Sequence, residues 1–94
     1  MTTTTDTLPL RPLGGTGLLV TPLCVGGAPL GDMPETFAYS APEDQALATI
    51  RAAFAGPINF LDTAAAYGDG ESERRIGLVI KELGGLPPGY VLAT

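Results

Sequence analysis

The chain has 94 residues and 45% apolar side chains, which suffices for one small domain with a hydrophobic core. Glycine (13) and proline (9) are frequent, which indicates many turns. The net charge is −5, with five basic against ten acidic residues. Because no basic cluster is present to neutralise phosphates, nucleic acid is not an expected partner.

The N-terminal residues 1–9 are expected to form a disordered tail. Residues 1–7 are threonine-rich and lack the basic start and apolar core of a signal peptide. No apolar run approaches the ~20 residues that span a bilayer. We therefore expect a soluble, cytoplasmic protein with no membrane partner.

Short apolar segments predict the first strands. Residues 10–13 and 18–21 flank a glycine-rich turn and predict a β-hairpin. Residues 23–27 predict a short buried strand, and a polar loop is expected at 32–39. Within the strand, Cys24 is expected to be a small buried hydrophobe, because there is no second cysteine for a disulfide and no histidine to activate the thiol.

Two amphipathic stretches predict helices. The first starts at Ser40, which forms a capping box with Glu43, and ends at the Gly-Pro pair 56–57. The second is capped by Ser72 and stopped by the glycine pair 84–85. In both, apolar side chains recur three and four residues apart, as expected for a helix with one buried face.

Two further short apolar segments, residues 58–61 and 90–93, predict buried strands. The order after the hairpin is therefore β-α-β-α-β with short connections. This order implies an α/β fold with parallel strands joined by right-handed crossovers. Periodicity leaves open whether the sheet stays open or closes into a barrel.

Asp62 and Tyr67 are the side chains best placed for chemistry. Asp62 follows the strand at 58–61, and polar groups at the carboxyl ends of buried strands form the active sites of α/β barrels. We expect Asp62 to be partly desolvated and to need a cation, whereas Lys81 is expected to point to solvent. Small residues surround Tyr67, so its phenol is expected to face a cleft. The alternatives are that Asp62 is a turn or cap residue and that Tyr67 only packs.

Two other segments are weaker candidates. The glycine-rich run 26–31 follows a strand, and Gly26 and Gly27 would let a ligand approach the backbone closely. Because the run matches no phosphate-binding fingerprint, a simple strand terminator is the alternative. The acidic run 69–73 predicts no metal site, since it lacks EF-hand spacing and has no histidine or cysteine. We interpret it as an acidic helix N-terminus.

Three motifs together resemble the aldo-keto reductase family over nearly all of residues 11–94. The first, at 11–21, resembles the family's N-terminal hairpin. The second, at 26–31, is most similar to members that oxidise sugars at C1 or act on pyridoxal. The third comprises Asp62, Thr63, Ala64, Tyr67, Gly68, Gly70, Ser72, Glu73 and Gly77. The resemblance implies that residues 10–94 are the first part of a (β/α)8 TIM barrel, truncated.

The resemblance also implies a nicotinamide-dependent oxidoreductase. Such an enzyme interconverts a carbonyl group (aldehyde, ketone or sugar hemiacetal) and an alcohol or lactone by hydride transfer with NADP or NAD. Tyr67 would be the proton donor or acceptor, and Asp62 would hold, near the cofactor, a lysine that assists the phenol. A cation beside a phenol favours the phenolate. Gly26 and Gly27 would approach the cofactor or the small carbonyl or sugar substrate.

That lysine normally follows the strand seen here at residues 91–94, and a substrate-orienting histidine lies further on. Neither is present in the 94 residues. We therefore expect this chain to be inactive and to bind NADP or NAD weakly or not at all. The alternative is a truncated, catalytically inactive product with at most a binding or structural role. A hydrolase or lyase built on Asp62 is disfavoured, because it needs a second carboxylate or a metal site.

Overall fold

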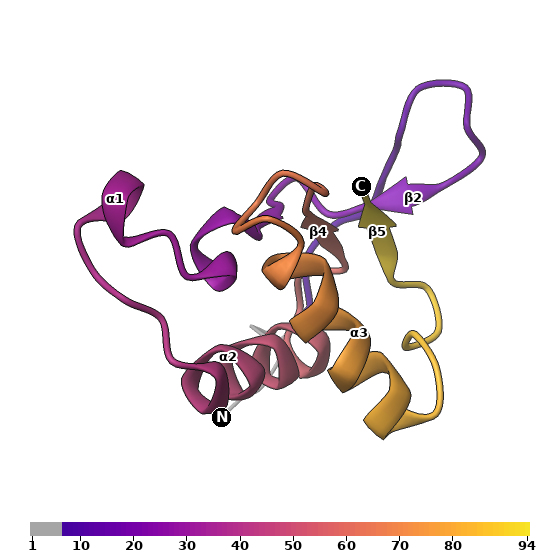
Figure 1. Cartoon of the computed structure of the whole chain (residues 1–94). Coiled ribbons are helices and arrows are strands. Elements are labelled where there is room, and N and C mark those ends of the chain that lie inside the picture. The colour runs from indigo at the N-terminus through magenta and orange to yellow at the C-terminus, as the bar shows by residue number, and fades with distance from the viewer. Residues whose placement is uncertain (1–6) are drawn as a thin grey trace.

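The computed structural model describes residues 7–94, so most of the predicted tail at 1–9 lies outside the described residues. Its last three residues, 7–9, belong to no helix or strand. A two-stranded hairpin precedes a three-stranded sheet, and two long helices pack against that sheet (Figure 1). The predicted α/β class and element order are confirmed.

The three-stranded sheet is parallel, as predicted. It consists of β3 (Val25–Gly26), β4 (Phe60–Asp62) and β5 (Val91–Ala93), in the order β3-β4-β5. Because the strands are parallel, their carboxyl ends lie at one edge. The loops that follow β3 and β4 therefore meet there, and this edge is where the predicted site residues are found.

The core lies between the sheet and the helices α2 (Glu43–Ala55) and α3 (Glu71–Leu83). Leu61, in the central strand, is fully buried, and its register partners Val25 and Leu92 pack against the same core. Side chains alternate along a strand, so the residues next to Leu61 point to the opposite face. The buried core comprises Leu30, Ala46, Ile50, Phe54, Leu61, Ile76, Val79 and Tyr90.

The predicted hairpin is formed by β1 (Arg11–Pro12) and β2 (Leu19–Val20), which pair antiparallel. It extends away from the helices (Figure 1). The side chain of Asn59, just before β4, connects it to the sheet. Its Oδ1 accepts a hydrogen bond from the Thr21 amide (2.8 Å), and its Nδ2 donates to the carbonyls of Leu19 and Gly89 (2.9 Å each).

The segment after β3 contains two short helices that the sequence did not predict. A 3-10 helix, η2 (Ala28–Gly31), replaces part of the expected glycine-rich loop, and α1 (Pro34–Phe37) lies within the expected polar loop at 32–39. Each has a proline in its first turn, where the missing N–H costs nothing. Four residues are too few to show a helical periodicity, so pattern reading could not find them.

Both predicted caps are wrong. The helix α2 begins at Glu43, after Pro42 in extended conformation, and no Ser40 side chain caps it. Proline disfavours helical backbone at the residue before it, so the helix cannot extend back to Ser40. The helix α3 begins at Glu71, after Gly70 with φ of 94°, and Ser72 lies inside it with its side chain buried.

Cys24 was expected to be buried, and this expectation is also wrong: the residue is exposed. Cys24 adjoins Val25, which packs against the helices, so the alternation of the strand turns Cys24 to the opposite face. Lys81 is exposed on α3, as predicted. No helix among the described residues has the length and apolar character needed to cross a membrane.

Candidate active site

Asp62 is the last residue of β4, at the carboxyl edge of the sheet, as predicted. Its backbone carbonyl accepts a hydrogen bond from the Gly27 amide (2.7 Å), which closes the end of β3 onto β4. Its side chain is exposed rather than partly desolvated. The reason is the alternation of the strand, which directs Asp62 to the face away from the helices. Within residues 7–94, no arginine or lysine forms an ion pair with it.

Tyr67 is half-buried in the loop that joins β4 to α3. Its amide donates to the Ala64 carbonyl (3.1 Å), and its carbonyl accepts from the Ser72 amide (3.3 Å). The backbone N–H and C=O of Tyr67 are therefore both fixed, the first by the loop itself and the second by the first turn of α3. No hydrogen bond or ion pair connects the Tyr67 and Asp62 side chains in the described part of the chain, so the structure brings them to one edge without pairing them.

The Tyr67 loop packs backbone to backbone on η2. A Cβ added at Gly31 would lie 2.9 Å from the Tyr67 carbonyl carbon, and one added at Gly68 would overlap the Gly31 carbonyl. Gly68 also has φ of 63°, in the left-handed region that glycine adopts without strain. Glycine is required at both positions, and the contact fixes the height of the Tyr67 loop above the sheet.

A buried hydroxyl pair joins the ends of β3 and β4 to α3. The hydroxyls of Thr63 and Ser72 lie 2.7 Å apart, and the Ser72 Oγ donates to the Gly27 carbonyl (2.8 Å). Thr63 also donates its amide to the carbonyl of Ala93 in β5 (2.8 Å). Two small side chains that are almost completely buried thus connect the carboxyl ends of β3 and β4 to α3, and the Thr63 backbone amide adds β5.

The two glycines predicted to approach a ligand have different surroundings. Gly26 is exposed, lies opposite Asp62 in register, and a Cβ added there would meet no atom within 4 Å. Gly27 is buried, and a Cβ there would lie 2.6 Å from the Asp62 carbonyl oxygen. Gly26 therefore leaves open space beside Asp62, whereas Gly27 is needed for close packing of the backbone.

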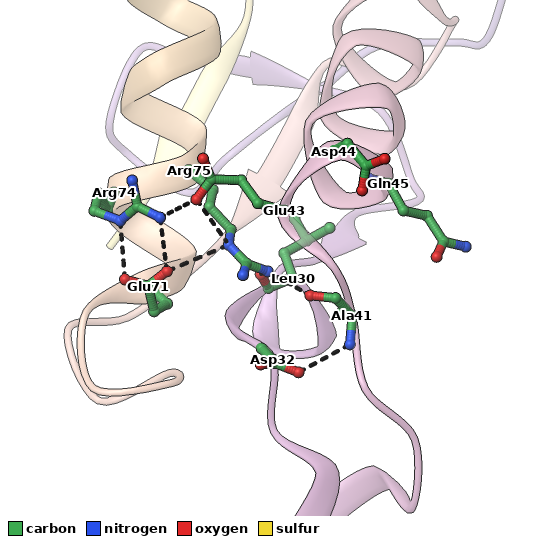
Figure 2. Close-up of polar contacts among 9 residues, drawn as sticks. All are labelled: Leu30, Asp32, Ala41, Glu43, Asp44, Gln45, Glu71, Arg74 and Arg75. Atoms are coloured by element: carbon green, nitrogen blue, oxygen red, sulfur yellow. Dashed lines mark hydrogen bonds and ion pairs between the residues drawn. The ribbon is translucent and has the colours of Figure 1, made fainter.

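A buried arginine fixes the loops behind this edge (Figure 2). The Arg75 side chain is 7% exposed, and its Nη1 donates to the carbonyls of Leu30 (2.9 Å) and Ala41 (2.8 Å). Its Nε lies 3.4 Å from Glu71 and 4.0 Å from Glu43. One guanidinium on α3 thus contacts η2, the approach to α2 and α2 itself.

The acidic run at 69–73 takes part in this arrangement. Arg74 donates to both Glu71 and Glu43. Its hydrogen bonds to Glu71, aided by the charges of Arg74 and Arg75, hold the pKa of that carboxyl below its usual value. Glu73 accepts from the Thr94 hydroxyl. The described residues contain no group of three His, Cys, Asp or Glu side chains arranged to hold a metal ion.

Sequence reasoning missed Arg75, Asn59 and the Thr63–Ser72 pair. Arg75 is one of two adjacent arginines in a helix with one buried face, and only tertiary structure shows that its side chain is buried. The partners of Asn59 lie 30 to 40 residues away in sequence. Ser72 was noticed, but local spacing suggested a helix cap rather than a contact with Gly27, 45 residues earlier.

The chain is thus a parallel α/β unit with Asp62 at the carboxyl edge of its sheet and Tyr67 in the loop that follows, the edge at which α/β barrel enzymes have their active sites. Comparison with known proteins then identifies the family. The model of the aldo/keto reductase family matches residues 22–94, and the chain belongs to this family. The resemblance stated from the three motifs is confirmed.

Two relatives show which members the chain is similar to. L-galactose dehydrogenase of Arabidopsis thaliana is 42% identical over 85 residues, 90% of this chain and 25% of the relative. Aldo-keto reductase AMT2 of Alternaria alternata is 39% identical over 71 residues, 76% of this chain and 19% of the relative. The chain therefore spans a quarter or less of these relatives. The first agrees with the predicted similarity to sugar dehydrogenases.

Proposed function

We propose that this chain is part of a nicotinamide-dependent oxidoreductase that interconverts carbonyl and alcohol or lactone groups in the cytoplasm. Residues 10–94 would be the first part of a (β/α)8 barrel, beginning with the hairpin and three of the barrel strands. The observation that carries the proposal is the presence of Asp62 and Tyr67 at the carboxyl edge of a parallel sheet in an aldo-keto reductase chain.

In this proposal Tyr67 moves the proton. When a carbonyl substrate is reduced, the Tyr67 Oη donates a proton to the carbonyl oxygen. In the reverse direction the Tyr67 Oη accepts the proton from the alcohol. A phenol releases its proton only near pH 10, so it needs a cation close by to work at neutral pH. Asp62 would hold that cation, a lysine supplied by sequence after Thr94. NADP or NAD, when bound, supplies or accepts the hydride.

The open space at Gly26 supports a cofactor on this face of the sheet. Gly26 and Asp62 are register partners, both are exposed, and no side chain fills the space above Gly26. A flat ring can therefore approach the backbone there, beside the carboxylate. Gly27 packs closely on the Asp62 carbonyl and so helps to position the backbone beside this space. A direct contact between Gly27 and a cofactor stays a prediction.

A second candidate is a catalytically inactive product with at most a binding or structural role. It is favoured by the surroundings of Asp62, since no cation among residues 7–94 pairs with this carboxylate. Both candidates expect the isolated chain to reduce no carbonyl substrate with NADPH. They differ in whether Asp62 and Tyr67 support turnover once the rest of a barrel is supplied.

A chimaera separates the two candidates. The matched residues of this chain would replace the corresponding quarter of Arabidopsis thaliana L-galactose dehydrogenase, and nicotinamide reduction with L-galactose would be followed by absorbance. We expect turnover by the chimaera and none by the isolated chain. A folded chimaera that binds cofactor without turnover would favour the inactive product, and turnover by the isolated chain would contradict both.

A further inference from the structure

We propose that Arg75 is a positioning residue that sets the place of the Tyr67 phenol from the far side of η2. The inference rests on the proposed role of Tyr67 as proton donor or acceptor. Among the hydrogen bonds and ion pairs of residues 7–94, none joins Arg75 to Tyr67, Gly26 or Asp62, so it would act through the backbone between them. Three contacts form the connection.

The first contact anchors η2. The Arg75 Nη1 donates to the Leu30 carbonyl at 2.9 Å, in the last turn of η2, and to the Ala41 carbonyl at 2.8 Å. The guanidinium is almost completely buried, and Glu71 and Glu43 lie within 4.0 Å of its Nε. Nε itself has no hydrogen-bond partner among the described residues, so the side chain is held through Nη1 and the two nearby carboxylates.

The second contact passes from η2 to the Tyr67 loop. Gly31 follows Leu30 directly, and its Cα packs on the peptide between Tyr67 and Gly68 without room for a Cβ on either side. Close-packed backbones transmit a displacement because neither can move into the other. A shift of the Leu30 carbonyl therefore becomes a shift of Tyr67.

The third contact returns to the helix that carries Arg75. The Ser72 amide, three residues before Arg75 on α3, donates to the Tyr67 carbonyl at 3.3 Å. The helix thus holds the Tyr67 loop directly at its first turn and indirectly through η2. Such a two-sided hold fixes both the height and the tilt of the loop, which is what a proton-transferring group needs to meet a substrate oxygen within hydrogen-bond distance.

The neighbouring arginine provides a matched control. Arg74 pairs with the same two carboxylates, Glu71 and Glu43, but its side chain is 47% exposed and donates to no backbone carbonyl of residues 7–94. Removal of Arg74 therefore disturbs the same ion pairs while η2 keeps its anchor. Only removal of Arg75 leaves the Leu30 and Ala41 carbonyls without a donor.

The test is NMR on the 94-residue chain with ¹³C-labelled tyrosine rings. The chain has three tyrosines, whose ring signals can be told apart. The Tyr90 ring packs in a T-shaped arrangement against Phe54, with the ring centroids 4.8 Å apart, and reports whether the core is intact. We expect Arg75→Met to move the Tyr67 signal while Tyr90 stays in place, and Arg75→Lys to move it less. Arg74→Met should leave Tyr67 unchanged, and Gly68→Ala should move it with Arg75 intact.

An unchanged Tyr67 signal in folded Arg75→Met would overturn the proposal, because loss of a merely stabilising arginine lowers the melting temperature without moving Tyr67 selectively. If Arg75→Met does not fold, Arg75→Lys decides: a Tyr67 shift with Tyr90 in place supports the proposal, and no shift overturns it. The signals are read without turnover, so this result stands apart from the chimaera assay. A chimaera without turnover would refute the proposed chemistry of Tyr67. An unchanged NMR signal would refute only the proposed effect of Arg75 on the position of Tyr67.

Discussion

At the scale of single residues, the buried phenol of Tyr90 has a measurable consequence. Its hydroxyl has no hydrogen-bond partner among the described residues, and only 9% of the residue is exposed. Burial, with a smaller contribution from the negative charge of a Cys24 thiolate, raises the pKa of Tyr90 to about 12. The fold therefore favours the neutral phenol, whose pKa in an unfolded chain is about 10.

The sign of the pH effect follows from this difference. The stabilisation is fully present below pH ~10 and is lost as the pH rises toward ~12, with a slope that approaches about 1.4 kcal/mol per pH unit. Tyr90→Phe should match the parent chain or exceed it in stability at pH 7, because no hydroxyl is left unpaired. Urea unfolding between pH 8 and 11.5 should show the parent chain losing stability relative to Tyr90→Phe above pH ~10. Parallel stability profiles for both proteins would contradict the raised pKa of Tyr90.

The buried Ser72 hydroxyl supports a second prediction. Ser72→Ala leaves the Gly27 carbonyl without that donor and the Thr63 hydroxyl without its partner. Unsatisfied buried polar groups of this kind cost about 1–3 kcal/mol of unfolding free energy. Ser40→Ala, at an exposed position, is the matched control and should change the stability by less than about 0.5 kcal/mol. Equal urea midpoints for the two variants would count against the buried hydroxyl pair.

At the scale of elements, the Asn59 side chain hydrogen-bonds the hairpin to the segment before β5. Asn59→Asp keeps an acceptor for the Thr21 amide but loses the donor to Leu19 and Gly89. We expect the Leu13 amide, which donates to the Leu18 carbonyl, to exchange with deuterium faster, because the hairpin separates from β4 and β5. Exchange in α3 serves as the internal control. If amide exchange becomes faster to the same extent in the hairpin and in α3, the substitution destabilises the whole fold instead of releasing the hairpin.

The elements differ in how far the sequence predicted them. The helices α2 and α3 were predictable because Ile50, Phe54, Ile76 and Val79 recur at helical spacing and are buried. The short helices η2 and α1 were not, since a proline-led turn looks like a loop. The Ser40 cap failed because Pro42 blocks a helix start at Ser40, which a match to a motif does not take into account.

For the site, the sequence predicted the place better than the environment. The position of Asp62 after an apolar run placed it correctly at the carboxyl edge of β4. Its exposure depends on which face of the sheet is covered, and alternation along a strand leaves that open when the covering elements are unknown. Arg75 was unpredictable for a related reason, since its partners Leu30 and Ala41 are backbone carbonyls distant in sequence.

At the scale of the whole molecule, the sheet has one covered and one open face. The helices cover Leu61, whereas Cys24, Gly26 and Asp62 on the other face are exposed. Exposed leucines add to the apolar surface near the hairpin: Leu10, Leu18, Leu19 and Leu23. Open sheet edges and apolar patches promote association.

We therefore expect the isolated chain to self-associate as its concentration rises, and the chimaera with a complete barrel to stay at one mass. Light scattering after size-exclusion chromatography, over a wide concentration range, measures this. A monodisperse monomer with a sharp cooperative melting transition would instead indicate a self-contained domain.

The most direct measurement compares two tyrosines in the chimaera. Tyr67 lies at the proposed site, and Tyr39, 54% exposed in the loop before α2, is the control. Because general acid–base groups contribute about 10²–10⁴-fold, Tyr67→Phe should lower kcat by that factor with cofactor binding retained. Tyr39→Phe should leave kcat within about twofold of the parent chimaera, the small change expected of an exposed substitution away from the site. A Tyr67→Phe chimaera as active as Tyr39→Phe would contradict the role of Tyr67 in proton transfer.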